Sequence, residues 1–236
     1  MCLQQLHAKL VAWREAGCGA TAPQLRDSEP LKFHSRLQAV NCDARYGVAL
    51  LVVCGLLLAL QFCGGPAIHL LRYDRAAIAA GQWWRLLTAH LVHLNFRHAA
   101  LDVAGLALLW ALFARDLRPG QWAVIVLTAA AAIDCGLWLR DPSVQWYLGV
   151  SGVLHGVLAA GAFVGLRRGH LESWILAGLL LAKLIYEQIQ GPMPFAGSET
   201  PVVVDAHLYG GLGGLAAIIT LRLGSRWLRG VHPARN

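Results

Sequence analysis

The stretch YGVALLVVCGLLLALQFCGGPAIHLL, residues 46–71, contains no Asp, Glu, Lys or Arg. A membrane-spanning helix needs about 20 consecutive, mostly apolar residues, so this run is long enough to cross a bilayer. It follows a polar segment that is too long for the charged start of a signal peptide. We therefore expect residues 46–71 to form the first transmembrane helix and to be retained as an anchor.

Five further apolar segments follow this first run. They cover residues 98–114, 121–139, 149–166, 171–189 and 206–222. The 236-residue chain is 57% hydrophobic and 14% charged, which is too apolar for an ordinary soluble domain. Its 25 glycines favour closely packed helices over the alternating strands of a β-barrel. The sequence predicts an all-α membrane protein, a six-transmembrane-helix bundle over residues 46–223 with cytoplasmic tails at 1–45 and 224–236.

The connection between the first two spans, residues 72–97, has an unusual composition. It carries Trp83, Trp84 and Phe96 among arginines and histidines, as expected for a segment at a membrane interface. We expect this segment to be structured.

The formal net charge of +7 is distributed as in a membrane protein rather than as in a nucleic-acid-binding one. With six spans, both tails and two short loops share one face, and that face carries fourteen Lys and Arg residues against five on the other. The positive-inside rule then places both termini in the cytoplasm. We expect the lipid bilayer to be a partner and nucleic acid not to be one.

Neither the cysteines nor the clustered histidines suggest a metal site. The six cysteines show no CxxC spacing, and His90, His93 and His98 do not form an HExxH pattern. We expect no metal and no organic cofactor.

Three polar residues are predicted to meet at the outer face. Span 149–166 enters there at Ser151, span 206–222 at His207, and span 98–114 at His98. A hydroxyl, an imidazole to take its proton and a further donor are what covalent catalysis requires. The glycines beside Ser151 leave backbone amides accessible, and Gly210 and Gly214 lie on the helix face of His207, where they allow close packing.

These motifs resemble a known family. GVSGVLHG (149–156), DAHLYGGLGG (205–214) and RYDRAAIAAGQWWRLLTAHLVHL (72–94) look like the rhomboid intramembrane serine proteases, and more narrowly the rhombosortase branch, over residues 71–223. The resemblance implies a Ser151–His207 dyad that cleaves membrane-anchored proteins near their transmembrane segment. It also implies substrates with a Gly-Gly-containing C-terminal anchor, and an outward-facing site in a bacterial inner membrane.

The resemblance extends to the surroundings of the dyad. It places Gly149 beside the nucleophile, and His98 and Asp102 at the polar positions of the family's HxxxN motif, which helps to stabilise the oxyanion. Asp102 replaces the motif's Asn, and a carboxylate there repels an oxyanion unless it is protonated or turned toward a cation. His155, one turn after Ser151, is either a rival base or a ring packed beneath the base, and we expect the second.

Several polar groups remain outside the dyad. Asp134, Lys183 and Glu187 lie inside predicted spans, where they need partners, and we expect structural pairing, with an ion or proton pathway as the alternative. Asp205 is interpreted as a helix cap rather than a third catalytic residue. The segment 190–205 is either a lid over the site or an ordinary loop.

Two other functions remain open. A non-catalytic rhomboid-like protein would bind membrane helices, but such proteins typically lack the dyad. A small transporter could use the intramembrane His, Asp and Lys residues as a relay, although no inverted repeat is evident.

Overall fold

The computed structural model describes residues 44–194 and 202–231 of the chain. Residues 1–43 of the predicted N-terminal tail and the middle of segment 190–205 lie outside the described residues. The choice between lid and loop for that segment therefore stays a prediction.

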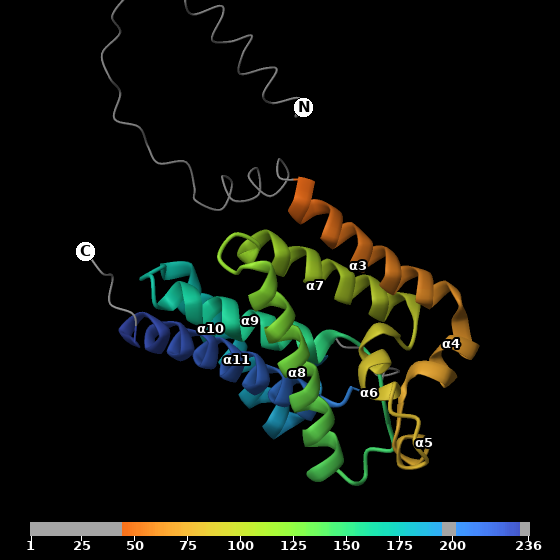
Figure 1. Ribbon diagram of the computed structural model, residues 1–236. Helices are drawn as coiled ribbons and strands as arrows, with labels where there is room; N and C mark the ends of the chain where they lie inside the picture. Colours follow the sequence, from red (N-terminus) through yellow and green to blue (C-terminus); the bar gives the residue numbers. More distant parts are fainter. Residues whose placement is uncertain (1–43, 195–201, 232–236) are drawn as a thin grey trace, which may run out of the picture.

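The described chain folds as a bundle of helices (Figure 1). The long ones are α3 (Ala44–Phe62), α7 (Phe96–Phe113), α8 (Pro119–Leu139), α9 (Ser151–Leu166), α10 (Leu171–Gln190) and α11 (Val204–Val231), with the shorter α4 (Gly64–Leu71) directly after α3. Each predicted span corresponds to helix within a few residues, except that α11 continues well past the expected end at 222. The prediction of an all-α membrane bundle is confirmed.

The first span is not one straight helix, as the sequence suggested. Helices α3 and α4 are bent by 109° at a break around Cys63. Gly64 adopts a φ of +64°, a left-handed conformation that ends a helix, and Pro66 in the next turn has no backbone N–H to donate. The absence of charge across 46–71 therefore predicted the membrane segment correctly but its continuity wrongly.

Three described helices are long and apolar enough to cross a membrane, namely α7, α8 and residues 204–224 of α11. The number is four if the bent α3–α4 pair is counted as one span. Helix α9 is apolar but only 16 residues long. An ideal helix of that length measures about 24 Å, less than the ~30 Å of a hydrocarbon core. Helix α10 contains three charged residues, Glu172, Lys183 and Glu187. The chain is a multi-pass membrane protein in which α9 is too short to reach both surfaces.

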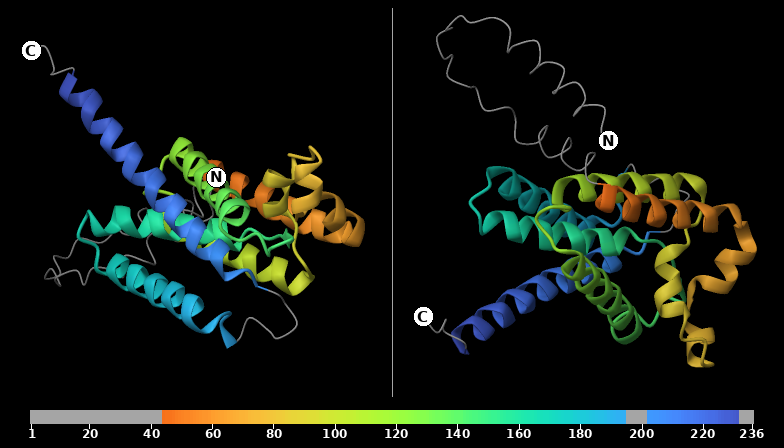
Figure 2. Two further views of the ribbon diagram at one scale, coloured as in Figure 1. Left: turned by 90° about the horizontal axis from the view of Figure 1, so that it is seen from below. Right: turned by 45° about the horizontal axis from the view of Figure 1, so that its top comes forward.

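Helices α9 and α11 cross at unusually close range (Figure 2). Gly152 and Gly156 on α9 face Gly210 and Gly214 on α11, and a Cβ at Gly156 would lie 2.6 Å from the carbonyl oxygen of Gly210. A Cβ at Gly210 or Gly214 would likewise overlap the backbone of α9. Only glycine permits this backbone-to-backbone contact, which fixes the start of α11 against the start of α9.

The connection 72–97 is structured, as expected. It contains β1 (Tyr73–Asp74), α5 (Arg75–Ala79), α6 (Arg85–Thr88) and the 3₁₀ helix η1 (Ala89–Leu91). Strand β1 pairs antiparallel with β2 (Trp146–Tyr147), with Tyr73 opposite Tyr147. The connection is therefore tied to the segment that leads into Ser151.

Arg75 attaches the connection to the end of α8. Its guanidinium donates hydrogen bonds to the carbonyl oxygens of Leu137, at 2.7 Å, and Trp138, and lies 4.8 Å from the centre of the Trp138 ring. The last carbonyl groups of a helix have no partner within it, and a cation placed there satisfies them.

Burial of the Tyr147 hydroxyl, on strand β2, raises the pKa of that phenol, which therefore stays protonated.

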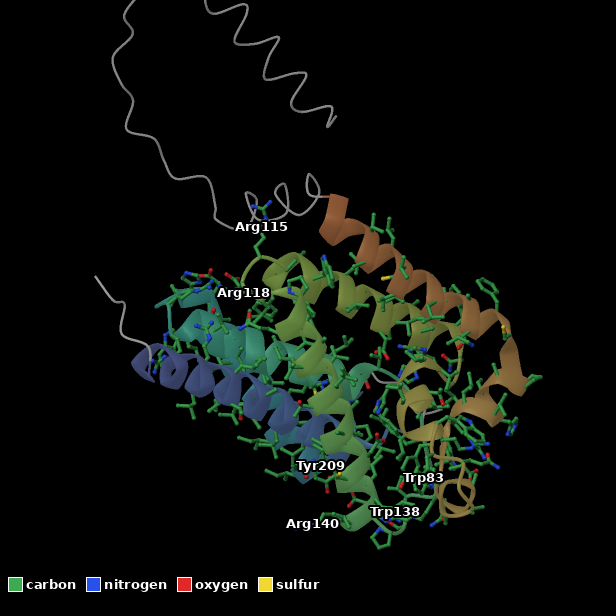
Figure 3. The ribbon with its side chains drawn as sticks, in the orientation of Figure 1. Trp83, Arg115, Arg118, Trp138, Arg140 and Tyr209 are labelled. Atoms are coloured by element: carbon green, nitrogen blue, oxygen red, sulfur yellow. The ribbon has the colours of Figure 1, made fainter. Side chains whose placement is uncertain are left out.

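Arginine and tryptophan side chains lie at the two ends of the bundle (Figure 3). Arg115 and Arg118 lie at one end, whereas Trp83, Trp138 and Arg140 lie at the other. Trp83 is 72% exposed, consistent with a ring at a membrane interface. The charge asymmetry and the direction in which the bundle faces stay predictions.

The glycine crossing can be tested by adding one methyl group. We expect Gly210→Ala to lower the free energy of unfolding by about 1–3 kcal/mol because its Cβ overlaps the carbonyl of Gly152. Gly211→Ala is the matched control, since its Cβ meets only Leu184, at 3.5 Å. Thermal unfolding in detergent measures both, and equal melting temperatures would contradict the proposed crossing constraint.

Candidate active site

Ser151 is the first residue of α9, and the turn before it is held firmly. The Gly149 N–H donates to the Ala89 carbonyl at 2.9 Å, and its carbonyl accepts from the Tyr147 hydroxyl at 3.0 Å. Gly149 has a φ of +112°, and a Cβ there would lie 2.9 Å from the His98 ring. Conformation and crowding both require glycine at this position. The Ser151 side chain is therefore presented from a fixed turn at a helix N-terminus.

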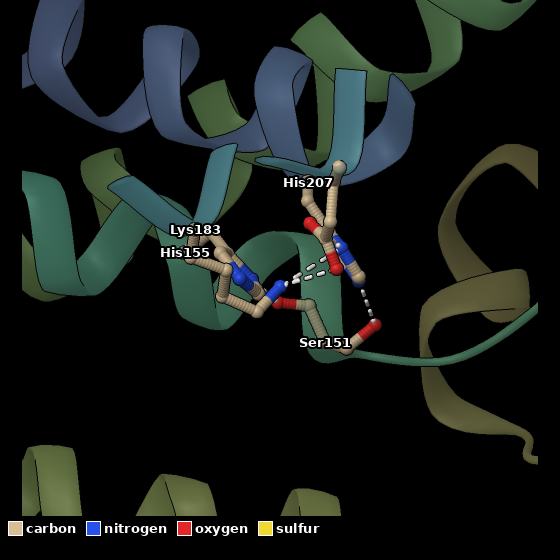
Figure 4. Close-up of polar contacts among 5 residues, drawn as sticks. Ser151, His155, Lys183 and His207 are labelled. Atoms are coloured by element: carbon tan, nitrogen blue, oxygen red, sulfur yellow. Dashed lines mark hydrogen bonds and ion pairs between the residues drawn. The ribbon is translucent and has the colours of Figure 1, made fainter. Parts of the chain in front are cut away.

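His207 meets Ser151 from the first turns of α11. Its Nε2 atom lies 3.2 Å from Ser151 Oγ, and Figure 4 shows the two side chains pointing toward each other. His207 is buried, so the contact forms inside the bundle. The convergence of these two residues, expected from their depth in separate spans, is present in the structure.

His155 packs against the ring of His207. Its ring stacks on that of His207 with centroids 4.2 Å apart and planes 16° from parallel. Its Nδ1 is 2.7 Å from the Ser151 carbonyl oxygen, and since a carbonyl only accepts, this nitrogen is the donor. This is the packing expected for a ring beneath the base, and it orients His207 from one side.

Two charged residues of α10 contact the other side of His207. Glu187 Oε2 lies 2.9 Å from His207 Nδ1, and Lys183 Nζ lies 2.7 Å from Glu187 Oε1 and 3.3 Å from His207 Nδ1. The sequence predicted structural pairing for these residues without naming the partners, and the structure pairs Lys183 with Glu187. The contact of this pair with His207 was not predicted from the sequence. The only sequence feature that pointed to it was an oppositely charged pair at i, i+4 on an otherwise apolar helix.

His98 and Asp102 lie on α7, beside the turn that carries Ser151. Asn95 caps α7 by accepting from the His98 N–H at 2.9 Å. Asp102 Oδ2 is 3.1 Å from Nε2 of the fully buried His93 and 3.4 Å from Nε2 of His98. The Asp102 carboxylate thus lies beside two imidazole rings, whose N–H groups can donate to it.

The remaining polar groups lie away from Ser151. Asp134 on α8 is 3.6 Å from His90 of η1, so its partner is a histidine of the connection. Asp205 lies one residue inside α11, which begins at Val204, and is therefore not the residue preceding the helix, as a cap would be. Its charge still faces the positive end of the helix, which is favourable.

A cavity of about 250 Å³ opens onto Ser151 and His207. Helices α7, α9, α10 and α11 contribute to its wall. The lining residues include His98 and Leu101 of α7, His155 of α9 and Lys183 of α10. A second, narrow hollow of about 30 Å³ lies between Ser151, His98, Tyr147 and Val203. Both hollows are lined by Ser151, His98 and His207.

One group of residues has the spacing of a metal site. Ligand atoms of His155, Glu187 and His207 all lie within 4.8 Å of one another. The Lys183 ammonium already contacts the same carboxylate and imidazole, which disfavours a second cation there. Among the residues that the structure describes, His90, His93 and His98 do not form such a group.

Fold and site together define a helical membrane protein in which a serine and a histidine from separate helices meet at a cavity lined by four helices. The Rhomboid domain family model matches residues 80–224, more than half of the chain. The chain belongs to the rhomboid family.

Two curated proteins of Bacillus subtilis (strain 168) are similar to this chain. It is 25% identical to "Putative rhomboid protease YdcA" over 137 residues, 58% of this chain and 66% of that protein. It is 24% identical to "Rhomboid protease GluP" over 150 residues, 64% of this chain and 28% of that protein. The chain thus spans less than two thirds of the curated relatives it matches.

The Asp102 cluster generates a stability prediction. Asp102→Leu removes the only carboxylate near the buried His93 ring among the contacts described, and we expect it to cost about 1–3 kcal/mol of unfolding free energy. Asp102→Asn keeps an acceptor oxygen and should cost less. Thermal unfolding of both variants measures the difference, and a Leu variant as stable as the Asn variant would show that the imidazoles do not need this partner.

Proposed function

We propose that this protein is an intramembrane serine endopeptidase that cleaves membrane-anchored proteins near their transmembrane segment. The observation that carries the proposal is the 3.2 Å contact between Ser151 Oγ and His207 Nε2 at a cavity inside the bundle. Membership of the rhomboid family and similarity to two proteins named as rhomboid proteases support it.

The chemistry follows from the positions of the two side chains. Ser151 Oγ attacks the scissile carbonyl carbon while its proton passes to His207 Nε2. His207 then gives this proton to the leaving amine, and an acyl-enzyme on Ser151 remains. A water molecule, deprotonated by the same nitrogen, hydrolyses the ester and regenerates the serine.

The developing oxyanion has donors close to Ser151. The N–H groups of the first turn of α9 have no partners within the helix, and its N-terminus carries positive potential. His98 lines the same hollow and can add a side-chain donor. Donors fixed before the reaction stabilise the charge without reorganisation, which makes this arrangement effective.

The substrate class is proposed from the family resemblance and from the size of the site. The rhombosortase branch implies a C-terminal anchor containing a Gly-Gly pair. The 30 Å³ hollow beside Ser151 accommodates a residue with little or no side chain more readily than a large one. We further propose a bacterial inner membrane with both termini in the cytoplasm and the site facing outward.

The nucleophile can be tested with a fluorophosphonate probe on protein in detergent or native membranes. We expect the wild type to be labelled, and Ser151→Ala and His207→Ala to lose labelling, because the probe reacts only with an activated serine. Ser143→Ala, at an exposed serine of the loop before β2, should label as the wild type does.

The outcomes of this experiment separate the candidate functions. Loss in both variants supports a catalytic serine and base. A folded wild type that reacts with none of several serine probes would instead indicate a non-catalytic membrane-helix binder or a transporter.

The role of His155 gives a second prediction. We expect His155→Ala to retain part of the labelling rate, because it removes a stacking ring but neither reacting atom. His155→Phe should retain more, since it restores an aromatic face against His207. Complete loss in both, matching His207→Ala, would show that His155 takes part in the proton transfer.

A further inference from the structure

Glu187 divides its two carboxylate oxygens between two partners. Oε1 accepts from Lys183 at 2.7 Å, and Oε2 lies 2.9 Å from His207 Nδ1. The Glu187 side chain is only 3% exposed. Burying a carboxylate costs several kcal/mol, and pairing within α10 required only Lys183. The second oxygen is directed instead to another helix, at the imidazole nitrogen opposite the one that faces Ser151.

We propose that Glu187 is a positioning residue that holds the proton of neutral His207 on Nδ1 and stabilises the imidazolium formed when Nε2 takes the serine proton. This inference rests on the proposed function of the Ser151–His207 pair. Glu187 stays ionised throughout: the Nδ1 proton remains on His207, and only the Nε2 proton moves, first from Ser151 and then to the leaving amine.

The need for such a residue follows from the competing tautomer. Lys183 Nζ lies 3.3 Å from His207 Nδ1 and could donate to that nitrogen if it carried no proton. The proton of His207 would then be on Nε2, which could no longer accept from Ser151. Glu187 accepts from Nδ1–H and engages the ammonium through its other oxygen, so it favours the tautomer that can act as a base.

The groups that face His207 determine how the site responds to pH. The groups that contact His207 or line its cavity are Glu187 and Lys183 of α10, Ser151 and His155 of α9, and Arg97, His98 and Asp102 of α7, with Asp205 two residues earlier on α11. The carboxylate of Glu187 favours the imidazolium, whereas the Lys183 ammonium opposes it. Removing the Glu187 charge and removing the Lys183 charge should therefore move the acidic limb of the pH–rate profile in opposite directions.

The kinetic test measures the fluorophosphonate labelling rate of the full-length protein against pH. Glu187→Gln keeps the volume and removes the charge, and we expect its rate to fall by at least ~100-fold and its acidic limb to move to lower pH. Lys183→Met should move the acidic limb to higher pH. Glu187→Asp should recover part of the rate, and Glu172→Gln, on the exposed start of the same helix, is the matched control.

A second measurement reads the tautomer without using activity. In the Ser151→Ala background, ¹⁵N NMR of the His207 ring should show the proton on Nδ1, and adding Glu187→Gln should transfer it to Nε2 in part or fully. An unchanged tautomer, or wild-type labelling and pH dependence in Glu187→Gln, would overturn the role of Glu187 while leaving the serine and base intact. A wild type that never labels would overturn the proposed function itself, whatever the tautomer.

Discussion

The contact between the glycines of α9 and α11 is the constraint on which the rest of the structure depends. In lipid, apolar side chains gain little by leaving their surroundings, so helices associate through close van der Waals contact and polar interactions. Gly156 and Gly214 let the two backbones touch, and this sets both the depth and the rotation of α11. Ser151 and His207 lie at the same end of this crossing, so their 3.2 Å contact is a consequence of backbone packing.

The connection between α4 and α7 serves as a clamp on the site. Its strand β1 pairs with β2, and Ala89 accepts the N–H of Gly149, so the turn before Ser151 is held from outside the bundle. Arg75 joins the same connection to the C-terminal end of α8. Two independent attachments, the glycine crossing and this clamp, therefore determine where the serine side chain points.

The sequence could predict the features that depend on length, charge and depth. Predominantly apolar runs located the helices, and the matching starts of three spans predicted that Ser151, His207 and His98 lie close together. It could not predict what depends on local backbone geometry or helix rotation. The break at Cys63 lies within an uninterrupted apolar run, and the absence of charge does not distinguish one long helix from two shorter ones. Tertiary packing alone determines that the Glu187 side chain points toward α11.

The order of the site residues along the chain has a consequence for biosynthesis. His207 lies on α11, the last helix of the described bundle, and its partners Ser151 and Glu187 lie on the two helices before it. Chains emerge from the ribosome N-terminus first, so Ser151 is made before His207. An incomplete chain lacking α11 would carry Ser151 without His207. The protein can therefore bring Ser151 and His207 together only after α11 has been translated and has packed against α9.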